Sequence, residues 1–155
     1  MSKKARPVPR GYRTATPYLI IKDAASAIDF YKQAFKAKVL MCLSEPSGKV
    51  GHAEIKIGDS RIMLADEYPE LGSRGPQSFG GSPVSILLYV EDCDTIFEQA
   101  LAKGAKIVKP MSDQFYGDRA GTLEDPFGHV WTVATHKEDL TSEEILKRVS
   151  SSSSR

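Results

Sequence analysis

Hydrophobic and polar positions alternate with a period of two in some parts of the chain and near 3.6 in others. The run "TPYLII" (16–21) favours a strand, and "AASAIDFYKQAF" (24–35) places apolar residues on one helical stripe behind Asp23, a suitable N-cap. The segments "KVLMCL", "VGHAEIKIG" and "RIMLAD" predict three further strands, separated by turn signals. This half of the chain therefore predicts the order β-α-β-β-β.

The same order restarts after the Gly-, Pro- and Ser-rich stretch 67–83. "SILLYV" predicts a strand, Asp92 is a second N-cap for "CDTIFEQALAK", and Gly104 lies where a C-cap glycine belongs. "AKIVKP", "DRAGTLED" and "HVWTVAT" supply three more strands. A shift of 69 residues, from 23 to 92, aligns the two halves and indicates an internal duplication.

These elements predict an α+β fold of two paired βαβββ modules that form one structural domain. We expect a flexible arm at 1–13, a first module at 14–67, a linker at 68–83 and a second module at 84–137. A short C-terminal helix and a disordered serine-rich tail are expected within 138–155.

Composition narrows the possible partners and the compartment. The 21 basic and 20 acidic residues nearly cancel, so the chain has no excess charge for binding nucleic acid. No apolar run approaches the length of a membrane span. Cys42 and Cys93 stand alone, which fits a reducing cytoplasm and no disulfide framework.

Three stretches of the chain resemble a known family: "TPYLIIKDAASAIDFY", "GHAEIKIGDSRIMLADE" and "QFYGDRAGTLEDPFGHVW". They are similar to the vicinal oxygen chelate superfamily of glyoxalases, bleomycin-resistance proteins and extradiol dioxygenases, and most similar to its PhnB-like branch. The resemblance implies modules whose mixed sheet curls around a concave cavity, often completed by homodimerisation. Relatives commonly have "AFGA" where this chain has "AFKA", so a left-handed Lys36 would carry strain of roughly 1 kcal/mol.

Strand alternation predicts which side chains face the cavity. In "GHAEIKIG" the apolar set Ala53, Ile55 and Ile57 suits the helix side, which leaves His52, Glu54 and Lys56 on the cavity side. The predicted ligand-binding residues are Tyr18, Met63, Leu87, Tyr89, Tyr116, Asp118 and Arg119. His52 and Glu54 are the candidate acid-base pair, with Arg119 as a clamp for a carboxylate or phosphate.

The alternative interpretation of this group is structural, with Glu54 and Arg119 pairing across the concavity and His52 bonding a neighbour. In "EDPFGH", Asp125 is expected to cap a turn in which Gly128 supplies the positive dihedral angle. His129 and Trp131 are expected to be structural rather than catalytic.

The resemblance also implies four metal-ligand positions, on the first and last strands of each module. In this chain they fall on Thr16, Met63, Ser85 and Thr132, which are poor ligands for a cation that prefers imidazole or carboxylate. We therefore expect no cofactor, although a divalent metal bound by His52 and Glu54 stays open.

Three functions follow as hypotheses. The first is a cytoplasmic, homodimeric protein that binds a small organic molecule in the cavity between the modules without the usual metal site. The second is a lyase, isomerase or dioxygenase that uses His52 and Glu54 in acid-base chemistry or as metal ligands. The third is an interaction module with a collapsed cavity.

Overall fold

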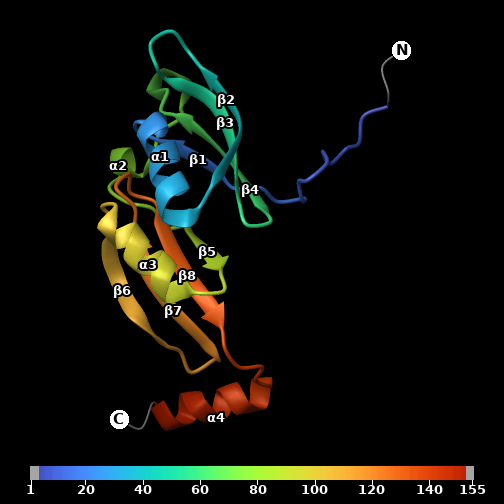
Figure 1. Cartoon of the computed structure of the whole chain (residues 1–155), viewed down its shortest axis with the longest axis vertical. Helices are drawn as coiled ribbons and strands as arrows, with labels where there is room; N and C mark the ends of the chain where they lie inside the picture. The colour runs from blue at the N-terminus through green and yellow to red at the C-terminus, as the bar shows by residue number, and fades with distance from the viewer. Residues whose placement is uncertain (1–3, 153–155) are drawn as a thin grey trace. The chain divides into compact units, whose positions relative to one another are not determined.

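The computed structural model describes residues 4–152, and the chain divides into two units, Met1–Gly81 and Ser82–Arg155. The first unit contains β1 (Tyr18–Ile21), α1 (Ala24–Phe35), β2 (Lys38–Ser44), β3 (Val50–Ile57), β4 (Ser60–Asp66), the short 3-10 helix η1 (Pro69–Leu71) and α2 (Pro76–Phe79). The second contains β5 (Ser85–Tyr89), α3 (Cys93–Ala102), β6 (Lys106–Asp113), β7 (Asp118–Glu124), β8 (Val130–His136) and α4 (Ser142–Ser152). Figure 1 labels the strands and the α-helices along the chain.

Each unit has one four-stranded sheet, in the order β1-β4-β3-β2 in the first unit and β5-β8-β7-β6 in the second. The first strand of each unit pairs in parallel with the last, and the other neighbours pair antiparallel. The repeated topology confirms the predicted α+β class and the two βαβββ modules.

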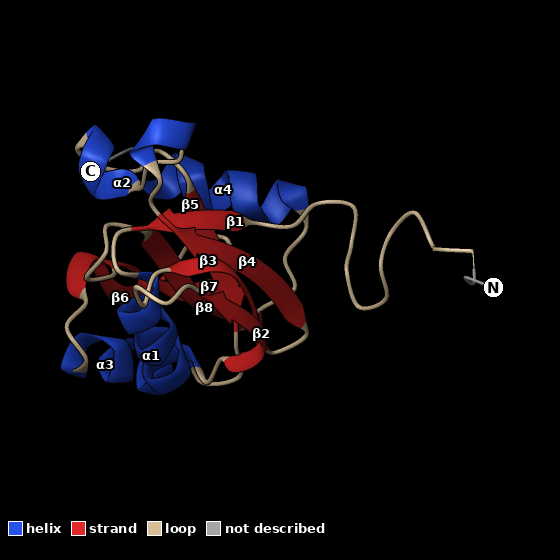
Figure 2. Cartoon of the chain, turned by 90° about the horizontal axis from the view of Figure 1, so that it is seen from above, coloured by secondary structure: helices blue, strands red, loops and turns tan. Residues whose placement is uncertain are grey.

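The core of each unit lies between its long helix and one face of its sheet. Helix α1 lies along the first sheet in Figure 2 and buries the stripe Ala27, Tyr31 and Ala34, each fully inaccessible. In the second unit, α3 packs on the sheet where Trp131 and Val133 are also fully inaccessible. The expected structural role of Trp131 therefore agrees with its position.

Carboxylate caps fix the starts of the helices, as the sequence predicts. Asp23 accepts a hydrogen bond from the Ser26 amide, and Asp92 accepts one from the Thr95 amide. At the other end of α1, Lys36 adopts φ 58° and ψ 34°, the left-handed conformation that the "AFKA" sequence raised as a possibility. A lysine therefore stands at a backbone position that glycine occupies more easily.

The turn between β7 and β8 is organised by one carboxylate. Asp125 accepts hydrogen bonds from the amides of Phe127 and His129 and from the indole N–H of Trp131, and Gly128 has a φ of 94°. The expected turn role of Asp125 thus extends to fixing the tryptophan ring in the core.

The segments expected outside the modules also carry structure. The stretch predicted as a linker contains η1 and α2, which belong to the first unit. The C-terminal helix α4 continues into the serine run as far as Ser152. Residues 1–3 of the expected arm and 153–155 of the expected tail lie outside the described residues. No helix within 4–152 is long and apolar enough to cross a membrane.

Candidate functional site

The open face of the first sheet, opposite α1, carries a row of polar side chains. Along β3, Ala53 and Ile55 are fully buried, whereas His52, Glu54 and Lys56 alternate with them and are partly exposed. The alternation of a pleated strand therefore places the three polar residues on one face, as predicted.

Hydrogen bonds connect this row across the sheet. The Tyr18 hydroxyl lies 2.8 Å from His52 Nδ1, and His52 Nε2 lies 3.4 Å from Glu54 Oε2. The other carboxylate oxygen, Glu54 Oε1, accepts a hydrogen bond from the hydroxyl of Tyr12. The imidazole thus has a phenol at one ring nitrogen and a carboxylate near the other, an arrangement able to donate or accept a proton.

The strand register explains why these residues meet. Tyr18 on β1 is paired with Met63 on β4, and Met63 is paired with Glu54 on β3. Three of the predicted site residues therefore form one row across adjacent strands. His52 precedes Glu54 by two residues on β3, so it lies on the same face, and there it contacts Tyr18.

A pocket of about 550 Å³ opens beside this row, within the first unit. Its lining residues are Tyr18, Ile20, Glu45, Gly51, Ala65, Asp66, Tyr68, Leu71 and Ser73. The volume falls within the range of roughly 300–1,000 Å³ that small-molecule sites occupy, and the mixture of apolar walls with a few polar groups is typical of them.

One wall of the pocket comes from the segment after β4. The Tyr68 hydroxyl donates a 2.8 Å hydrogen bond to Glu45, and the ammonium of Lys49 lies 4.9 Å from the centre of the Tyr68 ring. The hydrogen bond to the Glu45 carboxylate raises the pKa of Tyr68 to about 12, so the phenol stays protonated at neutral pH. The Tyr68 ring therefore gives the pocket an uncharged aromatic wall, and Glu45 and Lys49 hold that ring in place.

The structure locates the four positions that the family resemblance assigns to metal ligands. Thr16 precedes β1, Met63 lies on β4, and Ser85 lies on β5. Thr132 on β8 shares a 2.8 Å hydrogen bond with the hydroxyl of Thr122. Hydroxyls and a thioether are weak ligands for hard or borderline divalent cations.

A second polar cluster lies on the open face of the second sheet. The Asp118 carboxylate, 4 % exposed, accepts a 2.7 Å hydrogen bond from the Tyr89 hydroxyl and lies 2.7 Å from His136 Nδ1. The other ring nitrogen of His136 lies 2.7 Å from Asp139. Both nitrogens face carboxylates, which favour the doubly protonated ring, so first Asp118 and then Asp139 raise the pKa of His136.

Arg119 differs from its expected placement. Its guanidinium makes two hydrogen bonds to Asp94 on α3, at 2.8 and 2.9 Å, and a 3.3 Å contact with Asp113. The strand alternates, so Arg119 points to the helix side of the sheet while its neighbour Asp118 points to the open face. Asp118 and Arg119 therefore lie on opposite faces of the second sheet. The structure does not support a clamp at Arg119.

The other two predicted residues of this unit lie at the surface. Leu87 is exposed and alternates with buried Leu88 on β5, which places it on the same face as Tyr89. Tyr116 lies in the turn before β7 and makes an edge-to-face contact with Phe115, with ring centroids 5.2 Å apart.

Three contributors to these clusters, Tyr12, His136 and Asp139, were not predicted as site residues. Tyr12 belongs to the arm, where no periodicity signals a contact with β3. His136 had a detectable signal, because the turn at 125–128 fixes the hairpin register and thereby pairs Asp118 with His136. Extending that register from the turn would have placed the two side chains together.

Comparison with known proteins assigns the family. Residues 13–133 match the model of the Glyoxalase/Bleomycin resistance protein/Dioxygenase superfamily, and the chain belongs to this superfamily.

Similar proteins are found among both sequences and solved structures. The Mycobacterium tuberculosis protein Rv0887c is 42 % identical over 139 residues, which cover 88 % of this chain and 82 % of that protein. The structure of PA1353 from Pseudomonas aeruginosa matches with a TM-score of 0.67 at 24 % identity, covering 82 % of this chain and 100 % of that one. The fosfomycin resistance protein FosX from Listeria monocytogenes matches with a TM-score of 0.61 at 19 % identity, covering 86 % and 98 %. At these identities, the two structures support the fold alone.

Proposed function

We propose that the protein binds a small organic molecule in the pocket on the open face of the first sheet, without a metal ion at the family's usual positions. The observation that carries the proposal is the pocket of about 550 Å³ that Tyr18 lines while its hydroxyl contacts His52. A ligand there would meet apolar walls at Ile20 and Leu71 and a polar end at the tyrosine.

The chemistry of the four inherited positions supports binding without a cation. Two of them, Thr16 and Met63, belong to the first unit, and neither offers an imidazole or a carboxylate. With the hydroxyl of Thr16 and the thioether of Met63 at these positions, an organic ligand would contact the protein side chains themselves rather than a bound cation. The names of the superfamily and of FosX refer to drug resistance, which supports a protein that sequesters a compound.

The proposal also includes the branch of the superfamily, the cellular location and the assembly. The stretches "TPYLIIKDAASAIDFY" and "QFYGDRAGTLEDPFGHVW" support a place in the PhnB-like branch. The two free cysteines, Cys42 and Cys93, support a cytoplasmic location. A homodimer is the assembly that the family resemblance suggests.

A thermal-shift screen tests the proposal, using uncharged aromatic compounds, aromatic carboxylates, bleomycin and fosfomycin as probes. A probe that raises Tm should lose its effect in Tyr18→Ala and Leu71→Glu, which remove one wall and charge the rim of the pocket. Leu146→Glu is the matched control, since Leu71 and Leu146 are both exposed leucines, at 77 % and 65 %, and only Leu71 lines the pocket. Equal loss in the two Leu→Glu variants, or no shift with any probe, would refute the proposal.

The second candidate function is catalysis by His52 and Glu54. The 3.4 Å contact between them favours it, because a carboxylate beside an imidazole can orient it for proton transfer. Metal analysis of protein purified without a histidine tag separates the candidates. Stoichiometric Zn, Ni, Mn or Fe that is lost in His52→Ala supports the enzyme. Metal-free protein that still shows the ligand-induced shift supports the binding protein.

A further inference from the structure

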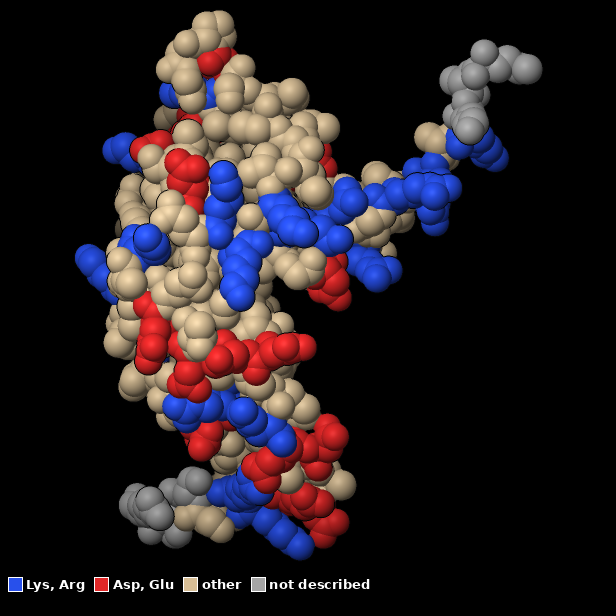
Figure 3. All heavy atoms as spheres, viewed as in Figure 1, with Lys and Arg blue, Asp and Glu red and all other residues tan. Residues whose placement is uncertain are grey.

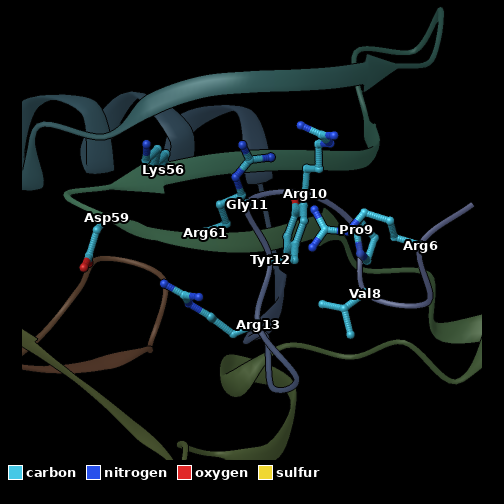
Figure 4. A pocket seen from close by; sticks show the side chains of 10 residues that line it. All are labelled: Arg6, Val8, Pro9, Arg10, Gly11, Tyr12, Arg13, Lys56, Asp59 and Arg61. Atoms are coloured by element: carbon cyan, nitrogen blue, oxygen red, sulfur yellow. The ribbon is translucent and has the colours of Figure 1, made fainter.

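A second pocket in the first unit lies where the N-terminal arm passes the β3–β4 hairpin. It has a volume of about 370 Å³ and shares no lining residue with the pocket beside Tyr18. Figure 4 shows the side chains that line it: Arg6, Val8, Pro9, Arg10, Gly11, Tyr12, Arg13, Lys56, Asp59 and Arg61.

Positive charge dominates this lining. Five of the side chains are cationic and one, Asp59, is anionic. Lys and Arg side chains also follow the arm in the space-filling view of Figure 3. Within residues 4–152, none of the five cations forms an ion pair, because no carboxylate oxygen lies within 4.0 Å of their nitrogen atoms. The overall net charge of +1 shows that this concentration is local.

Two of the cations stand directly opposite each other across the hairpin. Lys56 on β3 is the register partner of Arg61 on β4. Like charges at directly paired positions destabilise a sheet. A bound anion between them would remove that repulsion, because each cation would then face a negative group instead of the other.

The arm is held against this hairpin by specific contacts. The Arg61 guanidinium lies 5.0 Å from the centre of the Tyr12 ring, and the Tyr12 hydroxyl donates to Glu54. The Tyr12 amide donates a 3.1 Å hydrogen bond to the Pro9 carbonyl, which turns the arm. The stacked guanidinium keeps its N–H groups available, since stacking uses the ring face and not the donors.

Gly11 makes the close approach possible. Its φ is 83°, and a Cβ at this position would lie 2.4 Å from Arg61 Nη2. Any larger residue would therefore push the arm away from the guanidinium or displace Arg61. The glycine and the tyrosine together place Arg61 in the wall of the pocket.

From this geometry, we propose that the pocket between the arm and the β3–β4 hairpin binds a small phosphate-bearing anion through Arg61, Lys56 and the arm arginines. Guanidinium groups bind phosphate oxygens in bidentate geometry. A pocket of about 370 Å³ accommodates a small soluble ligand, whereas a nucleic acid needs an extended basic surface. This site is separate from the proposed ligand pocket, and neither proposal depends on the other.

Calorimetric titration of the full chain with inorganic pyrophosphate at low ionic strength tests the proposal. Arg61→Gln should weaken binding by about tenfold or more. Arg74→Gln is the matched control, because it removes the same charge from the same unit but does not line the pocket. We expect it to change Kd by less than about twofold, since an exposed charge outside a site contributes little.

Gly11→Ala provides a second variant that leaves the charge unchanged. It should also weaken pyrophosphate binding, because the added methyl group collides with the Arg61 guanidinium. Circular dichroism spectra matching the wild type confirm that the variants fold.

Three results would overturn the proposal. The first is no pyrophosphate binding by the wild type, and the second is an equal loss in Arg61→Gln and Arg74→Gln. The third is binding to duplex DNA or to anionic vesicles that is tighter than to pyrophosphate and unaffected by Gly11→Ala. The Tyr18→Ala and Leu71→Glu variants of the other pocket should still bind pyrophosphate, so the two proposals fail separately.

Discussion

The left-handed residue at the end of α1 allows a sharp test of the physical reasoning. Lys36 has φ 58° and ψ 34°, its amide donates to the Tyr31 carbonyl, and its side chain is exposed. The left-handed conformation costs an L-residue about 1–2 kcal/mol, which glycine avoids. Glycine also increases the conformational entropy of the unfolded chain, which costs about 0.4–1 kcal/mol. The difference predicts that Lys36→Gly stabilises the protein by about 0.5–1 kcal/mol.

Urea denaturation followed by far-UV circular dichroism measures this change, and thermal unfolding provides a second measure. For a chain of this size, the predicted free energy corresponds to a rise in Tm of about 1–4 °C. No side-chain contact is lost, because the lysine side chain is exposed, so the m-value should stay constant.

Asp23→Gly is the matched control, because Asp23 also has a positive φ, at 70°. Its carboxylate accepts hydrogen bonds from the Ser26 amide at 3.3 Å and the Ser26 hydroxyl at 2.7 Å, and glycine would remove both. The gain from relieved strain should therefore be smaller than in Lys36→Gly, because the cap is lost. A destabilised Lys36→Gly protein, or an equal gain in both variants, would refute the reasoning.

Three further substitutions test other contacts. Asp66→Asn should destabilise the protein by about 3 kcal/mol in urea denaturation, because the buried carboxylate accepts three backbone N–H bonds of 2.7–3.0 Å. Asp118→Asn should lower the raised pKa of His136 toward its ordinary value in an NMR titration, since Asp118 is the main cause of the shift. In the wild type, the stability from this pair should be fully present below about pH 6.5 and lost as pH rises through the raised pKa. Trp131→Phe should cost about 1–3 kcal/mol in thermal unfolding, because it removes the 2.9 Å bond to the buried Asp125.

Each of these expectations has a result that contradicts it. An Asp66→Asn protein within about 0.5 kcal/mol of the wild type would show that the three bonds contribute nothing net. A His136 resonance that titrates identically with and without the Asp118 carboxylate would rule out the assigned cause of the pKa shift. Wild-type stability of Trp131→Phe would mean that packing alone positions the ring.

The fold could be predicted from the sequence because the hydrophobic periodicity indicates the order β-α-β-β-β in each half, and the duplication repeats that order. Alternation along β3 also placed His52 and Glu54 on one face, next to Tyr18. It could have excluded Arg119 by the same rule, since Arg119 directly follows Asp118 in the strand. That assignment came from residue chemistry, which says what a guanidinium can bind but not where it points.

The contacts of the arm could not be predicted for a different reason. Tyr12 and Glu54 are 42 positions apart, and the arm has no repeating pattern of apolar residues that would indicate its docking surface. The hydrogen bond depends on a turn at Pro9 and on the absence of a side chain at Gly11. The conformational preferences of the arm residues therefore do not indicate which strand the arm contacts.

The duplication described above also has a chemical consequence. Each copy of the βαβββ repeat buries its own helix against one face of its own sheet. The opposite faces carry different side chains: imidazole, carboxylate and cations around 52–61 in the first copy, and a tyrosine, aspartate and histidine trio at 89, 118 and 136 in the second. One repeated scaffold can therefore present different chemistry on each of its two copies.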